Sequence, residues 1–185
     1  MKYPALVVLL LAVALRAGEF TPETDFSALF NGRDLSGWHH QGGPDLAGLI
    51  DAGDGRYTVV DGAISANADK ATHGRVLLWT AAEHTGNFVL RLEFRAAPKT
   101  DGGLFFNKTQ IQCGDYSSYA FKEFKFYKPE DWNALEVTVK DGVARCSCNG
   151  ELLVDALKIT DPGAIAIEAD KGAIAYRRLR IKPLP

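Results

Sequence analysis

Polar side chains that could bind a small polar ligand occur in two short stretches, residues 88–95 and 109–113, where polar and apolar residues alternate. In a β-strand, side chains two positions apart point to the same face of the sheet. If the apolar residues of both stretches fill a core, the polar residues stand on the opposite face. These polar residues are Arg91, Glu93 and Arg95 in the first stretch and Gln110 and Gln112 in the second.

These amide and charged groups are suited to binding a sugar. Sugar hydroxyls need both hydrogen-bond donors and acceptors, and the C–H faces of sugar rings can stack on aromatic side chains. Asn107, which precedes Gln110 across an expected irregularity, could add a further amide. The structural alternative is that the charged residues only form exposed cross-strand pairs, each contributing roughly 0.2–1 kcal/mol.

The sequence surroundings of the histidines and tryptophans give a weaker indication of a ligand-binding role. His39 and His40 follow Trp38, where a loop is expected to leave an apolar segment, and the other two histidines stand beside glycines in predicted turns. We expect solvated loop histidines, with contact to a ligand by His39 or His40 as the alternative. Trp38, Trp79 and Trp132 are expected to pack in the core rather than to form sugar platforms.

Several other kinds of site are absent from the sequence. It contains no G-x-S-x-G nucleophile motif, no H-E-x-x-H zinc motif and no glycine-rich phosphate loop. A formal net charge of −2, without any Lys/Arg-rich stretch, argues against a nucleic-acid partner, because phosphate binding relies on clustered positive charge. No metal or cofactor is assigned; a structural calcium held by loop oxygens stays an alternative, without EF-hand-like spacing to support it. The expected partner is a small carbohydrate, and the oligomeric state is left open.

The N-terminus resembles a secretory signal. Lys2 precedes a 12-residue apolar run, Pro4 to Leu15, and the small residues Ala12, Ala14, Ala17 and Gly18 close it. The run is shorter than the roughly 20 residues that span a membrane. We therefore expect a signal peptide at residues 1–17, a single domain at 18–185, a secreted or periplasmic protein, and no membrane partner after cleavage.

The elements that must position the polar residues are predicted to be β-strands. Alternation of period two returns in residues 135–140, 165–167 and 174–176, and no segment sustains helical spacing over several turns. Dipeptides that favour tight hairpin turns separate the strands, and they are Asp61-Gly62, Asp141-Gly142 and Asn149-Gly150. This pattern predicts an all-β antiparallel sandwich or barrel. One helical turn is expected at residues 25–30.

Three cysteines make an odd count for an oxidising compartment. Cys146 and Cys148 are two positions apart, so on a strand they share a face and are poorly placed to bond each other. We expect buried free thiols, with a bridge from Cys113 to one of the others as the alternative.

Five segments go beyond general β character. Residues 27–38, Ser-Ala-Leu-Phe-Asn-Gly-Arg-Asp-Leu-Ser-Gly-Trp, resemble the opening "LFNGKDLSGW" of the family of exported bacterial 3-keto-disaccharide hydrolase domains, formerly a domain of unknown function. Further matches to the family's "LWT...YGDFELRLEFR", "NSGIFFR", "KPAGEWN" and "RNIRIK" occur at residues 78–95, 101–106, 128–133 and 178–182. The resemblance covers nearly the whole chain after the leader.

The resemblance implies a concanavalin A-like jelly-roll of two antiparallel sheets. It also implies cleavage of the glycosidic bond in sugars already oxidised at C3. The ketone acidifies the hydrogen at C2, so a base can remove that proton and expel the C1 substituent, and the elimination product is then hydrated. This chemistry needs a base near C2, polarisation of the ketone and an acid for the leaving oxygen.

The sequence departs from the family pattern at two positions. The family's "YEVQILD" aligns with residues 109–115, where Gln110 replaces a glutamate and Asp115 is kept, and Asn107 replaces the arginine that ends "GIFFR". We therefore predict Glu93 or Asp115 as the base. Gln112 is predicted to hydrogen bond the ketone or a hydroxyl, with Gln110, Arg95 and Asn107 as further substrate-binding residues. The alternative function is a non-catalytic carbohydrate-binding module on the same fold.

Overall fold

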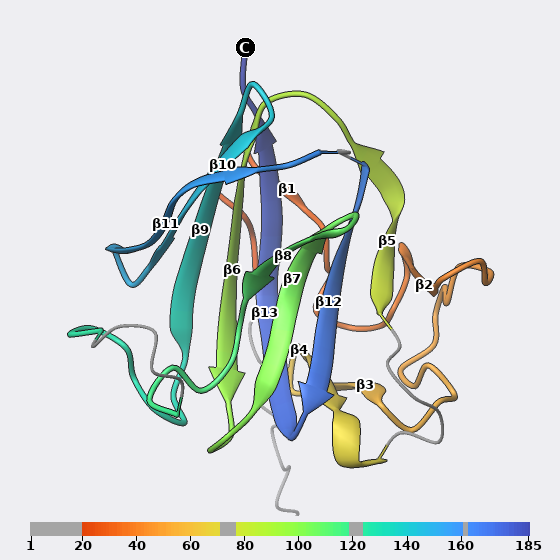
Figure 1. The fold of residues 1–185 in the computed structure, drawn as a ribbon. Coiled ribbons are helices and arrows are strands. Elements are labelled where there is room, and N and C mark those ends of the chain that lie inside the picture. The colour runs from red at the N-terminus through yellow and green to blue at the C-terminus, as the bar shows by residue number, and fades with distance from the viewer. Residues whose placement is uncertain (1–19, 71–76, 119–123, 161–162) are drawn as a thin grey trace, which may run out of the picture.

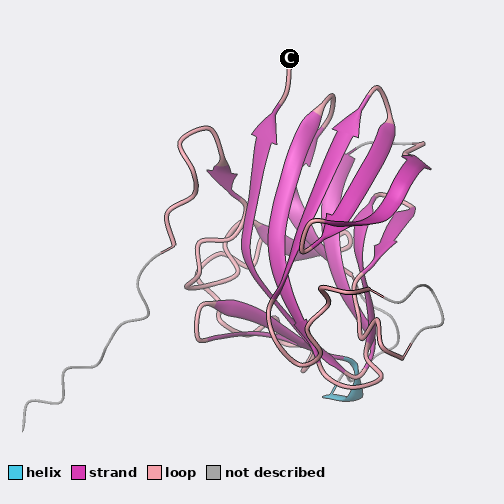
Figure 2. Cartoon of the chain, turned by 90° about the vertical axis from the view of Figure 1, so that its left-hand side faces the viewer, coloured by secondary structure: helices cyan, strands magenta, loops and turns pink. Residues whose placement is uncertain are grey.

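The computed structural model describes residues 20–70, 77–118, 124–160 and 163–185, which form two antiparallel β-sheets (Figure 1). Figure 2 shows strands throughout and one short helix at an end of the sheets, the 3-10 helix η1 (Ala68–Lys70). The all-β, two-sheet architecture expected from the sequence is thus confirmed. No helix in these ranges is long and apolar enough to cross a membrane. The expected leader at residues 1–17 lies outside the described residues.

The larger sheet has eight strands in the order β11-β10-β9-β6-β13-β4-β3, with β1 paired to β13. Its strands are β1 (Ser27–Ala28), β3 (Tyr57–Val60), β4 (Ala63–Asn67), β6 (Phe88–Ala96), β9 (Asn133–Lys140), β10 (Val143–Cys148), β11 (Glu151–Lys158) and β13 (Ala173–Pro183). The helical turn expected at residues 25–30 is wrong, because this segment forms β1. Its backbone pairs with the long strand β13, as in Ser27 with Ile181, and pairing to an open edge outweighs an isolated helical turn.

The smaller sheet has five strands in the order β2-β5-β12-β7-β8. They are β2 (Trp38–His40), β5 (Leu78–His84), β7 (Asp101–Phe106), β8 (Thr109–Gln112) and β12 (Gly163–Lys171). The strand β12 is therefore the centre of this sheet, hydrogen-bonded to β5 on one side and β7 on the other.

The core lies between the two sheets and is filled by the apolar set of each alternating strand. On β6 the inward residues Phe88, Leu90, Leu92 and Phe94 are all buried, as their spacing predicts. Phe88 packs against Phe106 of β7 in the opposite sheet, with ring centroids 5.8 Å apart. Alternation thus identifies correctly which residues of each strand face inward.

The predicted hairpin turns are present. Asp141 and Gly142 have φ values of 50° and 73°, and Asn149 and Gly150 have 49° and 81°. Positive φ at both central residues is the geometry that matches the twist of two antiparallel strands. Asp61 and Gly62 have the same geometry, with φ values of 50° and 74°.

All three cysteines are buried and free, so the expectation of unbridged thiols is confirmed. Burial raises the pKa of Cys113 well above its ordinary value, and that of Cys146 is raised for the same reason. A thiol that stays protonated in an apolar core is a poor nucleophile and metal ligand. These cysteines therefore act as small core residues.

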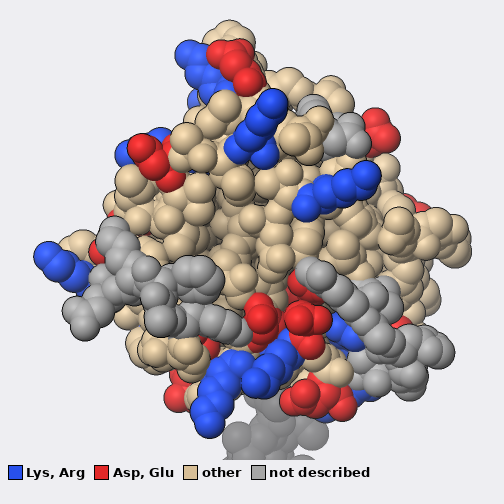
Figure 3. All heavy atoms as spheres, in the orientation of Figure 1, with Lys and Arg blue, Asp and Glu red and all other residues tan. Residues whose placement is uncertain are grey.

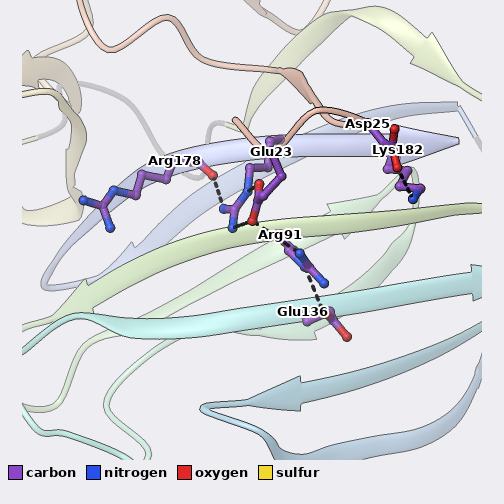
Figure 4. A network of polar contacts seen from close by, with 7 residues as sticks. Glu23, Asp25, Arg91, Glu136, Arg178 and Lys182 are labelled. Atoms are coloured by element: carbon purple, nitrogen blue, oxygen red, sulfur yellow. Dashed lines mark hydrogen bonds and ion pairs between the residues drawn. The ribbon is translucent and has the colours of Figure 1, made fainter. Parts of the chain in front are cut away.

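The N-terminal segment is held across the outer face of the larger sheet by ion pairs (Figure 4). Glu23 accepts hydrogen bonds from Arg180 at 2.6 and 2.8 Å and pairs with Arg91 at 3.3 Å. Arg91 also donates to Glu136 of β9 at 2.7 Å, and Lys182 pairs with Asp25 at 2.8 Å. The network links β9, β6 and β13 to the segment that precedes β1.

We predict that Glu23→Gln lowers stability in a pH-dependent way. Hydrogen bonding from Arg180 lowers the pKa of Glu23 from its ordinary 4.5 to about 2. Because the folded-state pKa is the lower one, the stabilisation is present above pH 4.5 and is lost as the pH falls towards 2. The side chain is half exposed, so the effect at neutral pH is expected to be about 1 kcal/mol or less. Urea unfolding at several pH values measures it.

The matched control is Glu83→Gln, which changes an exposed glutamate that forms no ion pair with the described residues. A difference between wild type and Glu23→Gln that stays constant from neutral pH down to 2 would contradict the role assigned to this carboxylate.

Candidate functional site

The residues that the sequence predicts as one site lie on two different sheets. Glu93 and Arg95 belong to β6 of the larger sheet, whereas Gln110 and Gln112 belong to β8 of the smaller sheet. Each pair alternates with buried residues and so faces outward from its own sheet. The two pairs therefore stand on opposite sides of the sandwich, and the single groove expected to hold them is not found.

Glu93 is already neutralised by two arginines. Arg177 donates to one carboxylate oxygen at 2.7 Å and Arg178 to the other at 2.8 Å. Burial raises the pKa of Glu93, but these hydrogen bonds outweigh it and leave the pKa below its ordinary value. A carboxylate held in this way is a weak base.

Arg95 and Asn107 also have settings that differ from the predicted substrate site. The guanidinium of Arg95 lies 4.8 Å from the ring centroid of Trp132, and that of Arg177 lies 3.9 Å from it. Asn107 has a positive φ of 51° and begins the turn between β7 and β8. Trp132 is therefore a surface ring covered by arginines rather than a core residue.

Asp115 is buried just beyond the end of β8 and organises the chain around it. Its carboxylate accepts hydrogen bonds from the Lys99 backbone N–H at 2.8 Å, from the Ser117 backbone N–H at 3.1 Å, and from the hydroxyls of Ser117 and Ser118. Burial raises the pKa of Asp115, but these donors outweigh it and leave the pKa lowered. The geometry is that of a structural carboxylate that closes a loop.

The outward face of the smaller sheet brings together a different set of residues, which we call the β12 face. Strand register places five residues in one row across it: His39, Trp79, Ala166, Phe105 and Gln110. Neighbouring strands are about 4.8 Å apart. The row therefore combines two aromatic rings, an imidazole and an amide around a small central residue.

The next row of the β12 face contains Glu168, Gly103 and Gln112. Glu168 lies on the central strand and is fully buried. It alternates with the core residues Ile165, Ile167 and Ala169, so its side chain belongs to the outward set of β12. Glu168 and Gln112 are two inter-strand spacings apart, or about 10 Å, with Gly103 of β7 between them.

Sequence reasoning missed Glu168 although a signal was present. Residues 164–169 read Ala-Ile-Ala-Ile-Glu-Ala, in which small residues and then a glutamate alternate with isoleucines. The isoleucines predict the strand correctly, and the same parity places the glutamate on the other face. The strand predicted at residues 165–167 therefore also predicts an outward position for Glu168.

The two glutamines of β8 are held close to the sheet. Gln112 donates to Asp101 at 2.5 Å, and Gln110 donates to the Gly102 carbonyl at 3.4 Å. A Cβ on Gly103 would lie 2.7 Å from the Gln110 amide nitrogen and 2.7 Å from the Phe105 ring. Glycine at this position therefore lets the amide and the ring lie across the strand.

His39 and Trp79 provide polar atoms on the same face. Nδ1 of His39 lies 2.7 Å from the His40 carbonyl oxygen, which can only accept, so this nitrogen carries the proton. Nε2 of His39 is left to exchange a proton. The indole N–H of Trp79 is buried and has no hydrogen-bond partner among the described residues, so packing in the core alone does not explain its position. His39 is half-buried on β2 rather than in a solvated loop, and its contact with a ligand stays a prediction.

Figure 3 views the smaller sheet from outside and shows acidic side chains gathered near one end of it. At that end β7 begins with Asp101 and β12 finishes with the exposed residues Asp170 and Lys171. The middle of the face is largely uncharged. In the described part of the chain, no three His, Cys, Asp or Glu side chains are grouped closely enough to hold a metal ion.

Comparison with known proteins supports a carbohydrate-active fold. The family model of the 3-keto-alpha-glucoside-1,2-lyase-like domain matches residues 25–182. A "putative glycosyl hydrolase" from Parabacteroides distasonis is 18% identical, with a TM-score of 0.66 over 86% of this chain and 94% of that chain. A second protein of the same description has 16% identity, a TM-score of 0.62 and coverage of 86% and 99%.

The carbohydrate-binding module CBM66 from Bacillus subtilis is 9% identical, with a TM-score of 0.53 over 80% of this chain and 96% of that chain. At these identities the likeness shows the fold, a jelly-roll sandwich shared by enzymes and binding modules. No match was found among curated proteins.

We predict that Asp115→Asn destabilises the protein by about 1–3 kcal/mol, because the amide places a donor where hydroxyl and backbone donors now point. Urea unfolding at neutral pH measures the loss. The control is Asp155→Asn, whose carboxylate is exposed on β11 and pairs with Arg145 at 3.3 Å, so little change is expected. Full stability of Asp115→Asn together with loss of activity would instead support a catalytic Asp115.

Proposed function

Because the chain belongs to the 3-keto-alpha-glucoside-1,2-lyase-like domain family, we propose that it cleaves the glycosidic bond of sugars that carry a ketone at C3. The observation that supports this most directly is Glu168 on the β12 face. It provides a carboxylate on the central strand of the smaller sheet, on the same face as Gln110, where the family pattern has a glutamate. The expected leader would place this activity outside the cytoplasm.

The proposed reaction begins with removal of the C2 proton. The adjacent ketone stabilises the resulting negative charge as an enolate, so a carboxylate is a sufficient base. The electron pair then forms a C1–C2 double bond while the C1–O bond breaks and the leaving oxygen gains a proton. Water adds back, with its hydroxyl at C1 and a proton at C2, so that the second product is again a 3-keto sugar.

Glu168 is the proposed base. Its row also holds Gly103, which has no side chain, and Gln112, whose amide is oriented by Asp101. In the neighbouring row, the rings of Trp79 and Phe105 flank Ala166 on the same strand as Glu168. Aromatic rings beside a carboxylate suit a sugar, because they offer surfaces to its C–H groups.

His39 is the proposed acid for the leaving oxygen. Its Nδ1–H is held by a backbone carbonyl in both protonation states, so Nε2 can give a proton and later take one from the water that attacks C1. His39 and Glu168 are two strands apart and one row apart on the β12 face. That spacing leaves room for the C1–C2 bond between the two side chains.

We predict that Glu168→Gln lowers the rate of leaving-group release from p-nitrophenyl 3-keto-glucoside by at least about 100-fold, the usual contribution of a general base. Release of p-nitrophenol measures it, and the unoxidised glucoside should be inert to both proteins. Asp170→Asn is the matched control, because it makes the same change two residues later on β12 at an exposed position. It is expected to keep the wild-type rate.

Glu93→Gln should also keep the activity if Glu168 is the base. Turnover that survives in Glu168→Gln but is lost in Glu93→Gln would refute this assignment. Saturable binding of the keto sugar by the wild-type protein, without any release, would instead support the alternative of a non-catalytic binding module.

The role of His39 predicts a dependence on the leaving group. His39→Gln should slow the release of methanol from methyl 3-keto-glucoside far more than the release of p-nitrophenol, because p-nitrophenolate leaves without protonation. A merely structural role would lower both rates by the same factor. Comparing the two substrates in the wild type and the variant separates these outcomes, with His84→Gln, on the distant end of β5, as the control.

A further inference from the structure

The larger sheet has a hollow of its own on the outer face, on the opposite side of the sandwich from the β12 face. It has a volume of about 240 Å³ and lies across β4, β13 and β6 near the end of each strand. Ala175 lies between Ser65 and Arg95 in register, so it forms the floor. Other residues lining the hollow include Ala97, Glu130 and Ala173.

The charges around this hollow differ from most of those on the same face. Five basic side chains there are each paired with a carboxylate, and these are Arg91, Arg177, Arg178, Arg180 and Lys182. Arg95 forms no ion pair with any described residue, and its contact is with the Trp132 ring at 4.8 Å. Glu130 lines the same hollow and likewise has no cationic partner in the described ranges.

We propose that this hollow is a second carbohydrate-binding site that takes a neutral saccharide. The guanidinium of Arg95 can donate to sugar oxygens, the carboxylate of Glu130 can accept from sugar hydroxyls, and the hydroxyl of Ser65 can do either. Alanine side chains on the floor leave room for the C–H face of a ring. Stacking on Trp132 holds the Arg95 fork in place before a ligand binds.

The hollow contains one cationic side chain, Arg95, and one anionic side chain, Glu130, and this balance favours a neutral ligand over an anionic one. An arginine alone would attract carboxylates and phosphates, but a glutamate beside it repels them. The hollow is also independent of the proposed reaction, because it shares no residue with the β12 face. A saccharide could therefore be bound on one sheet while another is processed on the other.

Binding can be followed through the side-chain Nε–H signal of Arg95 in ¹H–¹⁵N spectra of the whole protein, assigned with Arg95→Lys. Cellotriose and maltotriose serve as neutral probes and glucuronate as the anionic probe. The Arg95 signal should shift saturably with a neutral trisaccharide. Ala175→Leu, which fills the floor, should weaken that binding about tenfold or more, while Ala134→Leu, on the same face outside the hollow, should leave it unchanged.

Arg95→Met keeps a side chain that can lie on Trp132 but removes the donors, so it should also abolish binding, which in this variant is followed through the backbone N–H signals of Ser65 and Ala175 in the hollow. This variant tests the proposal if Ala175→Leu fails to fold. Glu168→Gln should bind the trisaccharide as the wild type does, and Ala175→Leu should still turn over p-nitrophenyl 3-keto-glucoside, so the two proposals fail separately. No shift with either trisaccharide, a shift with glucuronate alone, or equal binding by Ala175→Leu and wild type would each overturn the proposal.

Discussion

Two buried tyrosine hydroxyls tie the larger sheet to the central strand of the smaller one. Tyr57 donates to the Ile167 carbonyl at 3.1 Å, and Tyr176 donates to the Glu168 carbonyl at 2.7 Å. Burial raises the pKa of both phenols, so they stay protonated and act as donors. Because an unsatisfied buried donor is costly, these bonds fix where β12 sits and which of its residues point outward. Gly102, whose Cβ would lie 3.3 Å from the Tyr176 hydroxyl, makes the close approach possible.

The difference between local spacing and long-range strand pairing explains which features could be predicted from the sequence. Alternation within a strand is local, so the burial of Phe88 and the outward position of Gln110 followed from spacing alone. The sheet to which each strand belongs depends on pairing between distant segments, such as β6 with β13 and β7 with β12. Spacing could therefore place Glu93 and Gln110 on polar faces but could not show that these faces are on opposite sides. Alternation within β12 is enough to place Glu168 on the outward face. The residues around it depend on which strands pair with β12, and spacing alone does not give this.

The two outer faces differ in the environment that they give to a carboxylate. On the larger sheet, arginines neutralise Glu93 and Glu23 and lower the pKa of each, which stabilises the fold and the N-terminal segment. Such a carboxylate is committed to its partners and gains little by accepting a proton. The β12 face is largely uncharged around its centre, and its aromatic and amide groups can contact a polar ligand. Arginine pairing thus gives both Glu93 and Glu23 a structural role on the larger sheet.

Small residues decide where each face can receive a ligand. On the β12 face, Ala166 and Gly103 are the neighbours of Glu168 along its strand and across to β7, so no bulky group stands between the glutamate and the aromatic rings. On the larger sheet, Ala173 and Ala175 line the hollow beside Arg95 and Glu130. A larger residue at Ala173 or Ala175 would be tolerated by the strand itself, because both face away from the core, whereas Gly103 has no room even for a Cβ beside Gln110 and Phe105. The small size of Ala173 and Ala175 is therefore better explained by what the surface must accommodate than by the packing of the fold.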